Sequence, residues 1–342
     1  MSPGRRIRAL VVDDSAFARK VLREVLGASG DVELVGFARD GIDALEKIAE
    51  LAPDVVTLDL VMPELDGVGV LEALRAQGSK ARVIVVSTLE RDSKLAVAAL
   101  QAGAFDVVHK PTAVASDRLH ELAGELLEKV RAAGAPRPAA TSAATPFAGS
   151  AVAPGSTRLV VVGASTGGPH AITRLFRELD ASFPVPIAVV LHMPPGFTDL
   201  LAKRLDHECA LEVIEARDGL PLVPGRVVIA QAGIHMTVAR TDQGLAARLE
   251  LAPYESLHRP SVDALFTGAS KLGAGVLGIV LTGMGNDGLA GSRAIHAAGG
   301  RIITESESSC VVYGMPRCVR EAGLSHEEAT IADMSAALIR NL

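Results

Sequence analysis

Aromatic side chains are scarce in this chain of 342 residues, where they make up 3% of the total with two tyrosines and no tryptophan. Proteins that bind single-stranded nucleic acid stack bases on aromatic rings, and few rings are present here. An excess of basic residues is also lacking, because 34 lysines and arginines face 40 acidic residues and the net charge is -6. A basic face is the usual signature of nucleic-acid binding. We therefore expect no nucleic-acid partner.

Cysteines are few, and long apolar runs are missing. The three cysteines, Cys209, Cys310 and Cys318, form no C-x-x-C motif and cannot all pair within one chain. This favours a reducing cytoplasm. No uncharged apolar run reaches the roughly 18 residues of a membrane span, and the run near the N-terminus is too short for a signal peptide. We expect a cytoplasmic protein that does not insert into membranes.

The composition changes between Arg131 and Thr157, where Ala, Pro, Gly, Ser and Thr dominate and acidic residues are absent. Such a segment is typical of a linker. The chain length favours two domains, and a hydrophobic content of 49% is ample for their cores. We expect one domain at residues 1–130, a linker at 131–157 and a second domain at 158–342.

Apolar runs rich in valine and leucine alternate with helix-period segments in both domains. The expected strands of the first domain are Ala9–Val12, Val32–Phe37, Val55–Leu60, Val83–Val86 and Val107–Val108, with helices at segments such as Phe17–Leu26, Ala44–Leu51 and Lys94–Ala102. The expected strands of the second are Leu159–Val162, Ile187–Leu191, Val227–Ala230 and Val276–Leu281. This alternation predicts two α/β domains, each with a doubly wound parallel sheet.

Acidic and polar residues follow the expected strands of the first domain. Asp13 and Asp14 come after the first strand, Asp59 ends the third, Ser87 follows the fourth and Lys110 follows the fifth. Sites in open α/β sheets lie at this edge. Three converging carboxylates repel each other, and a hard cation such as Mg²⁺ relieves the repulsion. Lys110 and Ser87 could then hold phosphoryl oxygens while Asp59 acts as nucleophile.

A single aspartate at a strand end is usually a turn former or helix cap, so the joint pattern carries the prediction. The pattern comprises Asp-Asp at 13–14, LDLVMP at 58–63 with DG at 66–67, ST at 87–88 and KP at 110–111. It resembles the receiver domain of two-component response regulators over residues 7–130. The resemblance implies a flavodoxin-like fold, a histidine kinase as phosphoryl donor, and these roles: Asp59 the phospho-acceptor, Asp13, Asp14 and Asp59 the Mg²⁺ ligands, Lys110 the phosphate sensor and Ser87 the switch hydroxyl.

One position departs from the receiver pattern. The third residue before Lys110, often aromatic in receivers, is Val107. An aromatic rotamer switch is therefore not available there. Phe105 lies nearby, but strand alternation points it to the same side as Val107 only if the strand has already begun at Phe105. We assign Phe105 no switch role.

A glycine-rich turn, GASTGGP at 163–169, follows the first expected strand of the second domain. Such a turn could bring the backbone close to a phosphate at a helix N-terminus. Gly163-x-Ser165-x-Gly167 also has the form of a nucleophile elbow, which exposes a serine oxygen. A third interpretation is a plain turn in which Ser165 caps a helix. The turn alone does not decide among the three.

A base and an acid at the same sheet edge favour the elbow. His192 follows the strand at Ile187–Leu191, and Asp287 lies in LTGMGNDG at 281–288. Together with Ser165 they supply the hydroxyl, imidazole and carboxylate of nucleophilic catalysis. The chain order Ser, His, Asp differs from the order Ser, Asp, His of α/β hydrolases. The order argues against that fold and leaves the chemistry open.

Several other residues have weaker claims to this site. His235 either supports the site or packs in an edge strand, whereas we expect His258 and His296 on the surface. Asp263 could replace Asp287 beside the imidazole, but it opens a helix and is expected to be a cap or first-turn acid. No His/Cys cluster in the sequence has metal-ligand spacing, which argues against a zinc hydrolase.

Six segments of the second domain form a specific joint pattern: GASTGG at 163–168, HMP at 192–194 with GFT at 196–198, HM at 235–236, RPSVD at 259–263, LTGMGNDG at 281–288 and CVVYGMP at 310–316. From Leu159 nearly to the C-terminus, they resemble the catalytic domain of CheB-type protein-glutamate methylesterases. The resemblance implies that Ser165 is the nucleophile, His192 the base and Asp287 its partner. Backbone N–H groups around the elbow, with Thr166 and Met284 as candidates, would bind the oxyanion.

The resemblance also implies the substrate and the regulation. Methyl-accepting chemoreceptors would be the protein substrate, and methyl esters of their glutamate side chains would be hydrolysed during chemotaxis adaptation. Deamidation of receptor glutamines is implied as a second activity, and the esterase would need no cofactor. The receiver domain would rest on the rim that carries Ser165 until phosphorylation of Asp59 shifts this docking equilibrium.

Two functions of other classes remain open at this point. A nucleotide-dependent oxidoreductase would use the turn at 163–168 for a pyrophosphate, although no acidic residue ends the next strand to bind a ribose. A response regulator with a binding-only output would use the second domain as a docking module or DNA reader. Hydrolysis of a methyl ester that depends on Ser165 would exclude both.

Overall fold

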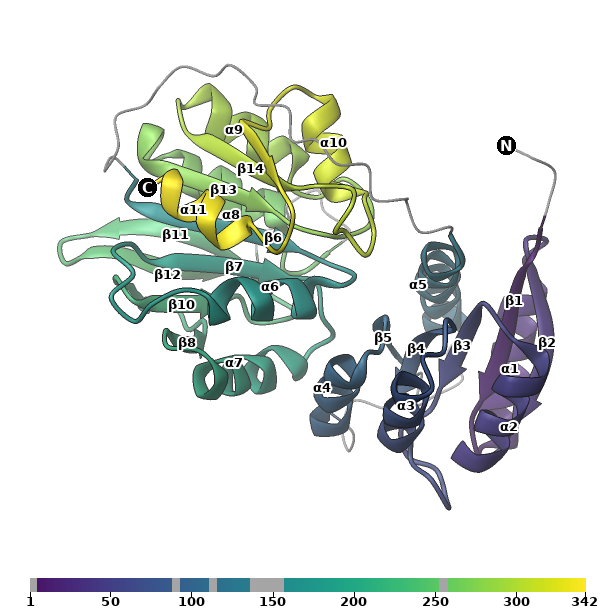
Figure 1. Ribbon diagram of the computed structural model, residues 1–342. Helices are drawn as coiled ribbons and strands as arrows, with labels where there is room; N and C mark the ends of the chain where they lie inside the picture. The colour runs from purple at the N-terminus through teal and green to yellow at the C-terminus, as the bar shows by residue number, and fades with distance from the viewer. Residues whose placement is uncertain (1–4, 88–92, 111–115, 136–156, 252–257) are drawn as a thin grey trace. The chain divides into compact units, whose positions relative to one another are not determined.

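A computed structural model describes residues 5–87, 93–110, 116–135, 157–251 and 258–342 of the chain (Figure 1). The chain divides into two compact units, Met1–Arg137 and Pro138–Leu342. Each unit has its own parallel sheet. No helix within the described ranges is long and apolar enough to cross a bilayer.

The first unit is built on a five-stranded parallel sheet with the strand order β2-β1-β3-β4-β5. The strands are β1 (Ile7–Val12), β2 (Val32–Ala38), β3 (Val55–Leu58), β4 (Arg82–Ser87) and β5 (Asp106–His109). Every residue of the central strand β3 is buried, as expected for a parallel sheet that is covered on both faces. The predicted doubly wound sheet is confirmed.

Four helices connect these strands and a fifth follows β5: α1 (Ala16–Gly27), α2 (Gly41–Leu51), α3 (Gly67–Ala76), α4 (Ser93–Ala102) and α5 (Ser116–Gly134). Ser15, Asp40 and Asp66 cap the first three, because each side chain accepts a hydrogen bond from a backbone N–H of the first turn. Helix α1 packs against α5, whereas α3 packs against α2 and α4. The helices thus form two layers around the sheet.

Helix α5 extends past the expected start of the linker at Arg131. The helix continues to Gly134, because Arg131 pairs with Asp31 at 2.7 Å and Ala133 is buried. Alanine is a strong helix former, so the alanine-rich composition did not distinguish the helix end from a linker. Residues 136–156 of the predicted linker lie outside the described residues.

The second unit contains a seven-stranded parallel sheet with the order β15-β14-β13-β6-β7-β10-β8. Its strands are β6 (Leu159–Ala164), β7 (Ile187–Leu191), β8 (Glu212–Glu215), β10 (Arg226–Ile229), β13 (Val276–Val280), β14 (Arg301–Glu305) and β15 (Glu327–Ala329). The first strand, β6, lies between β7 and β13, so the strand order reverses beside β6. Ligand sites of doubly wound sheets occur at such a reversal.

Helices cover both faces of this sheet (Figure 1). They are α6 (Gly168–Arg177), α7 (Phe197–Glu208), α8 (Val262–Ser270), α9 (Leu289–Ala297), α10 (Met315–Glu321) and α11 (Met334–Arg340), with a short 3₁₀ helix at Gly273–Gly275. Helices α6, α7 and α11 contribute to one apolar cluster, and α8, α9 and α10 to another. Strand β6 supplies both clusters, because its successive side chains point to opposite faces.

A small antiparallel sheet was not predicted. Its strands are β9 (Pro221–Leu222), β11 (His235–Thr241) and β12 (Gly244–Glu250), in the order β11-β12-β9. Strand β11 packs against α8. The sequence left open whether His235 supports the site or packs in an edge strand, and β11, which begins at His235, is at an edge of this sheet. The two residues of β9 are too few to leave a periodic signal in the sequence.

Candidate functional site

Strand β6 ends in a tight turn that carries Ser165 at the carboxyl edge of the main sheet. The N–H of Ser165 donates to the carbonyl oxygen of Thr282 at 3.0 Å. Gly167 has a φ of +79°, a conformation that favours glycine. At Gly163 a Cβ atom would lie 2.3 Å from Val262 Cγ1, so glycine allows β6 to pack against α8. This strand, turn and helix have the form of a nucleophile elbow.

His192 follows β7, the strand next to β6, and its ring lies between a serine and an aspartate. The Nδ1 atom is 3.1 Å from Ser165 Oγ, and the Nε2 atom is 2.8 Å from Asp287 Oδ2. In the serine-protease triad the serine faces Nε2 instead. The arrangement here requires the tautomer that carries its proton on Nε2, because Nδ1 must be free to accept the serine proton. Nearly all of the imidazole is buried, with 9% exposed.

Asp287 follows β13, the strand on the other side of β6, and is held by the first turn of α8. Its Oδ1 accepts from Ser261 Oγ and the N–H of Asp263, both at 2.9 Å, and its Oδ2 accepts from the N–H of Val262 at 2.8 Å. Burial raises the pKa of Asp287, but the hydrogen bonds from His192 and α8 outweigh burial and lower the pKa to about 2. An ionised carboxylate at a helix N-terminus is also favoured by the helix dipole.

Asp263 does not bond the imidazole. It lies in the first turn of α8, as expected, and its Oδ1 accepts from the N–H of Gly291 at 2.6 Å. Burial raises the pKa of Asp263 to about 6, and the neighbouring charge of Asp287 acts in the same direction. The two aspartates therefore have opposite preferences: Asp287 is ionised, and Asp263 retains its proton to a higher pH.

The turn after β13 packs tightly against the serine. A Cβ atom on Gly283 would lie 2.8 Å from Ser165 Cβ and 2.3 Å from Met315 Sδ. The two backbone positions predicted to bind an oxyanion lie beside this contact, because Thr166 follows Ser165 and Met284 follows Gly283. Thr166 is buried and Met284 is half-buried. Both positions are thus in segments that adjoin the serine.

Two further histidines lie around the triad. His235 is fully buried at the start of β11, and its pKa is lowered by burial and Arg259, with a smaller opposing effect of Asp287. His258 is exposed, as expected, but its ring stacks on the ring of His192 with 4.0 Å between centroids. This contact was not predicted from the sequence. The only signal was the position of His258 directly before the RPSVD segment at 259–263.

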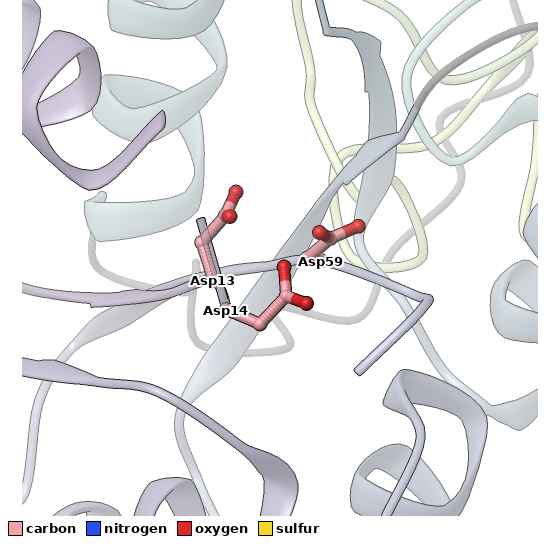
Figure 2. A group of neighbouring side chains, drawn as sticks. All are labelled: Asp13, Asp14 and Asp59. Carbon is pink, nitrogen blue, oxygen red and sulfur yellow. The ribbon is translucent and has the colours of Figure 1, made fainter. Parts of the chain in front are cut away.

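A second group of charged residues lies at the carboxyl edge of the first sheet, where Asp13, Asp14 and Asp59 gather at the ends of β1 and β3 (Figure 2). One carboxylate oxygen of each lies within 4.8 Å of the others. Lys110 Nζ is 2.7 Å from Asp13 Oδ2 and 2.8 Å from Asp59 Oδ2. Burial raises the pKa of Asp13 against the effect of Lys110, and the two aspartates raise the pKa of Lys110 against the effect of burial.

The remaining receiver residues are placed on the neighbouring strands. Ser87 is buried at the end of β4, and its carbonyl oxygen accepts from the N–H of Lys110 at 2.7 Å. Val107 is buried within β5, whereas Phe105 precedes that strand and its ring packs under Arg82. Phe105 therefore lies outside the strand. Residues 88 and 111 of the receiver pattern lie outside the described residues.

The three aspartates fit a hard divalent cation. Mg²⁺ prefers carboxylate oxygens and retains several waters, so it needs few protein ligands. Asp14 is exposed, which leaves the group open to water on one side, while Asp13 and Asp59 are buried. The like charge of Asp59 also acts to raise the pKa of Asp13. A cation between them would offset this repulsion.

The chain matches two family models: the response regulator receiver domain over residues 9–123 and the CheB methylesterase over residues 160–338. It is 57% identical to protein-glutamate methylesterase/protein-glutamine glutaminase 5 of Myxococcus xanthus, over 98% of each chain. It is 42% identical to the protein-glutamate methylesterase/protein-glutamine glutaminase of a Nocardioides species, over 98% of this chain and 95% of the relative.

A solved structure also resembles the second unit. The crystal structure of the Thermotoga maritima CheB methylesterase catalytic domain matches 54% of this chain and 99% of that domain, with a TM-score of 0.53 and 36% identity. At 36% identity the two proteins are similar in sequence as well as in fold. The same turns and strands that carry Ser165, His192 and Asp287 fall within the matched family segment.

Proposed function

The chain belongs to the CheB methylesterase family and carries that family's receiver domain, and from this premise we propose how its residues act. It hydrolyses methyl esters on glutamate side chains of chemoreceptors and also deamidates glutamine side chains. Because the chain belongs to a family of methylesterases, the two alternative functions, a nucleotide-dependent oxidoreductase and a response regulator with a binding-only output, are not supported. The observation that carries the proposal is the hydrogen-bonded series from Ser165 through His192 to Asp287.

In the first half of the reaction Ser165 Oγ attacks the carbonyl carbon of the glutamate methyl ester. His192 Nδ1 takes the serine proton and passes it to the departing oxygen, so methanol leaves and a glutamyl ester of Ser165 remains. Asp287 stabilises the imidazolium and holds its orientation. Water then attacks the acyl-enzyme, and its proton returns through His192 to Ser165. With a glutamine substrate the same steps release ammonia.

The negative oxygen of each tetrahedral intermediate needs donors that are already in place. We assign this role to the backbone N–H groups of Thr166 and Met284, which flank the contact between Ser165 and Gly283. Loss of one such donor slows other hydrolases by about 10²- to 10³-fold. His235 is assigned a supporting role, because it is buried within electrostatic range of Asp287.

In the receiver unit Asp59 accepts a phosphoryl group from a histidine kinase. Asp13, Asp14 and Asp59 would hold Mg²⁺, which neutralises negative charge on the phosphoryl oxygens when it is bound. Lys110 already pairs with Asp59 and is positioned to contact a phosphoryl oxygen on it. Ser87 supplies a hydroxyl at the neighbouring strand end. We expect the protein in the cytoplasm, because its proposed substrate is the cytoplasmic part of the receptor.

Regulation would follow from a change in the populations of two states, one with the receiver docked over the catalytic site and one with it released. If the unphosphorylated receiver rests on the rim around Ser165, phosphorylation of Asp59 must weaken that docking. A shift from 1:99 to 99:1 requires about 5.5 kcal/mol of differential stabilisation. A receiver that cannot be phosphorylated, as in Asp59→Asn, should leave the full chain at its basal rate in the presence of a small acyl phosphate and Mg²⁺.

The direct test measures methanol released from a methylated receptor fragment by the full chain. Ser165→Ala should abolish release, whereas Ser182→Ala should leave it unchanged, because the exposed Ser182 hydroxyl bonds only the nearby Asp180 among the contacts seen in the described structure. Retained activity in Ser165→Ala would refute the assigned nucleophile. An inactive wild type under phosphorylating conditions would refute the assigned substrate.

A further inference from the structure

A buried carboxylate that the reaction steps do not use is linked to the serine turn through Thr282. Glu305 is the last residue of β14, and 1% of it is exposed. Its Oε2 accepts from the N–H of Thr282 at 2.8 Å, and its Oε1 accepts from Ser309 Oγ at 2.9 Å. Burial raises the pKa of Glu305, and these hydrogen bonds act in the opposite direction. A buried carboxyl group with two neutral donors needs a structural or functional reason.

Thr282 connects Glu305 to the nucleophile. The carbonyl oxygen of Thr282 accepts the N–H of Ser165 at 3.0 Å, and Thr282 Oγ1 donates to the carbonyl oxygen of Thr166 at 2.9 Å. The same Oγ1 accepts the N–H of Val312 at 2.9 Å. All the polar atoms of Thr282 are therefore engaged. Its backbone N–H is the group that Glu305 holds.

The network also determines where Gly283 and Met284 lie. These residues continue the chain from Thr282, and Gly283 is in close contact with Ser165. A shift of the Thr282 backbone would move the carbonyl that anchors Ser165 and the N–H assigned to the oxyanion. Misplacement of reacting groups by about 1 Å can slow a reaction about 10²-fold. A residue that fixes Thr282 can thus influence the rate without contacting the substrate.

We propose that Glu305 is a positioning residue for the hydrolysis, which holds Thr282 and through it the Ser165 turn and the oxyanion donors. The proposal rests on the proposed function of Ser165. Glu305 acts as a hydrogen-bond acceptor rather than as a charge. A glutamine can take over this role, because its amide oxygen can accept from Thr282 and its amide group can donate to Ser309 Oγ.

Three variants of the full chain separate this role from general destabilisation. Glu305→Gln keeps the size and the acceptor, whereas Glu305→Met has similar length but no acceptor for Thr282. Thr304→Val is the matched control on the same strand, because Thr304 is fully buried and its hydroxyl bonds Ser325 at 2.7 Å. Its side chain and that of Glu305 point to opposite faces of the sheet.

The variants are compared by kcat and KM for methanol release and by the rate of acetylation of Ser165 with p-nitrophenyl acetate, which does not depend on the receptor. Glu305→Met should lower kcat and the acetylation rate about 10- to 100-fold with KM within about 3-fold of wild type. Glu305→Gln should stay within about 3-fold in all three quantities, and Thr304→Val should match wild type in kcat even if its melting temperature falls.

Four results would overturn the proposal: wild-type kcat in Glu305→Met, equal losses in the Gln and Met variants, a change confined to KM, or an equal loss of kcat in Thr304→Val. If Glu305→Met does not fold, Ser309→Ala replaces it, and a lower kcat with unchanged KM is expected. Activity of the wild type on p-nitrophenyl acetate without methanol release would refute the proposed substrate. The acetylation rates of the variants would still decide the role of Glu305.

Discussion

The two units each place a buried aspartate at the carboxyl edge of a parallel sheet, but they stabilise it in different ways. Asp287 is 8% exposed and Asp59 is 6% exposed. Asp287 accepts from backbone N–H groups of α8, from Ser261 and from an imidazole. Asp59 accepts from the N–H of Leu60 at 2.7 Å through Oδ1, and its Oδ2 pairs with the flexible side chain of Lys110 at 2.8 Å. Both oxygens of Asp287 are thus held by donors on α8 and His192, whereas one oxygen of Asp59 is held by the backbone and the other by a lysine side chain that can exchange partners.

The largest effect is expected from the fixed carboxylate. In Asp287→Asn the side-chain amide would meet N–H donors of Val262 or Asp263 and could not accept from all of them. The imidazole would lose its partner and its tautomer, so kcat for methanol release should fall about 10⁴-fold. Steady-state kinetics of the full chain measure this. Asp263→Asn is the control, because Asp263 does not contact His192, and an equal loss in both variants would contradict the assignment.

The next effect concerns the stability of the receiver unit. Lys110→Met leaves Asp13 and Asp59 buried without their cation, which should lower the free energy of unfolding by about 3 kcal/mol. Urea unfolding of the receiver unit, followed in the full chain without Mg²⁺, measures this. The double variant with Asp59→Asn should recover part of the loss, because one of the repelling charges is removed. Equal stability of Lys110→Met and wild type would mean that the pair is not formed in solution.

A backbone contact in the catalytic unit gives a smaller kinetic effect. In Gly283→Ala the added Cβ would approach both Ser165 and Met315, so the serine turn must shift. We expect kcat to fall about 10- to 100-fold. Phosphorylation of Asp59 by a small acyl phosphate serves as the internal control and should be unaffected, because the substituted residue belongs to the other unit. Unchanged kcat would show that the turn tolerates the displacement.

His258 tests how much the exposed side of the triad contributes. His258→Ala removes the ring stacked on His192, and because such a pair is worth about 0.5–1.5 kcal/mol, kcat should fall about 2- to 10-fold. His258→Phe keeps a ring and should recover most of the rate. A comparison of kcat between His258→Ala and His258→Phe decides whether loss of ring stacking causes the lower rate. Equal losses in both variants would indicate that the imidazole itself is needed.

The smallest effect is a pH dependence of opposite sign in the two units. Asp287 has a lowered pKa in the folded state, so it stabilises the fold above its unfolded pKa and loses this effect as the pH falls toward 2. Asp13 has a raised pKa, so its contribution is greatest at low pH and is lost as the pH rises. Relative to wild type, Asp13→Asn should therefore become more stable as the pH rises above about 4, the usual pKa of an aspartate. Relative to wild type, Asp287→Asn should become less stable as the pH rises from about 2 to 4. Urea unfolding at several pH values measures both, and slopes of the same sign would contradict the comparison.

The sequence indicated that Ser165, His192 and Asp287 lie in the turns after three apolar strands, and the structure brings their side chains within hydrogen-bond distance. Ser165, His192 and Asp287 come after β6, β7 and β13, whose continuous apolar runs are easy to recognise. The parallel sheet then brings their carboxyl ends to one edge. The choice of ring nitrogen was not predictable, because it depends on side-chain rotation at His192. Nor was the register that places Thr282 beside Glu305.

Glu305 was missed for a different physical reason. Its strand, β14, begins with Arg301 and ends with the glutamate, and the charges at both ends hide the apolar centre. Its neighbour β13 lies earlier in the chain, and strand order cannot be read from periodicity. The linker predicted from Arg131 overlaps the end of α5, because alanine-rich sequence is compatible with both a helix and a linker. These failures concern long-range pairing and composition, whereas the successes concern local patterns.

Modification of the serine by a fluorophosphonate probe tests the central claim most directly, because the probe reacts with a serine hydroxyl that a base activates. The full chain should be modified at Ser165 alone, as mapped by mass spectrometry of its peptides. The reaction should be at least about 100-fold slower in His192→Ala and in Asp287→Asn. Modification at another serine, or equal rates in all three proteins, would contradict a catalytic series from Ser165 through His192 to Asp287.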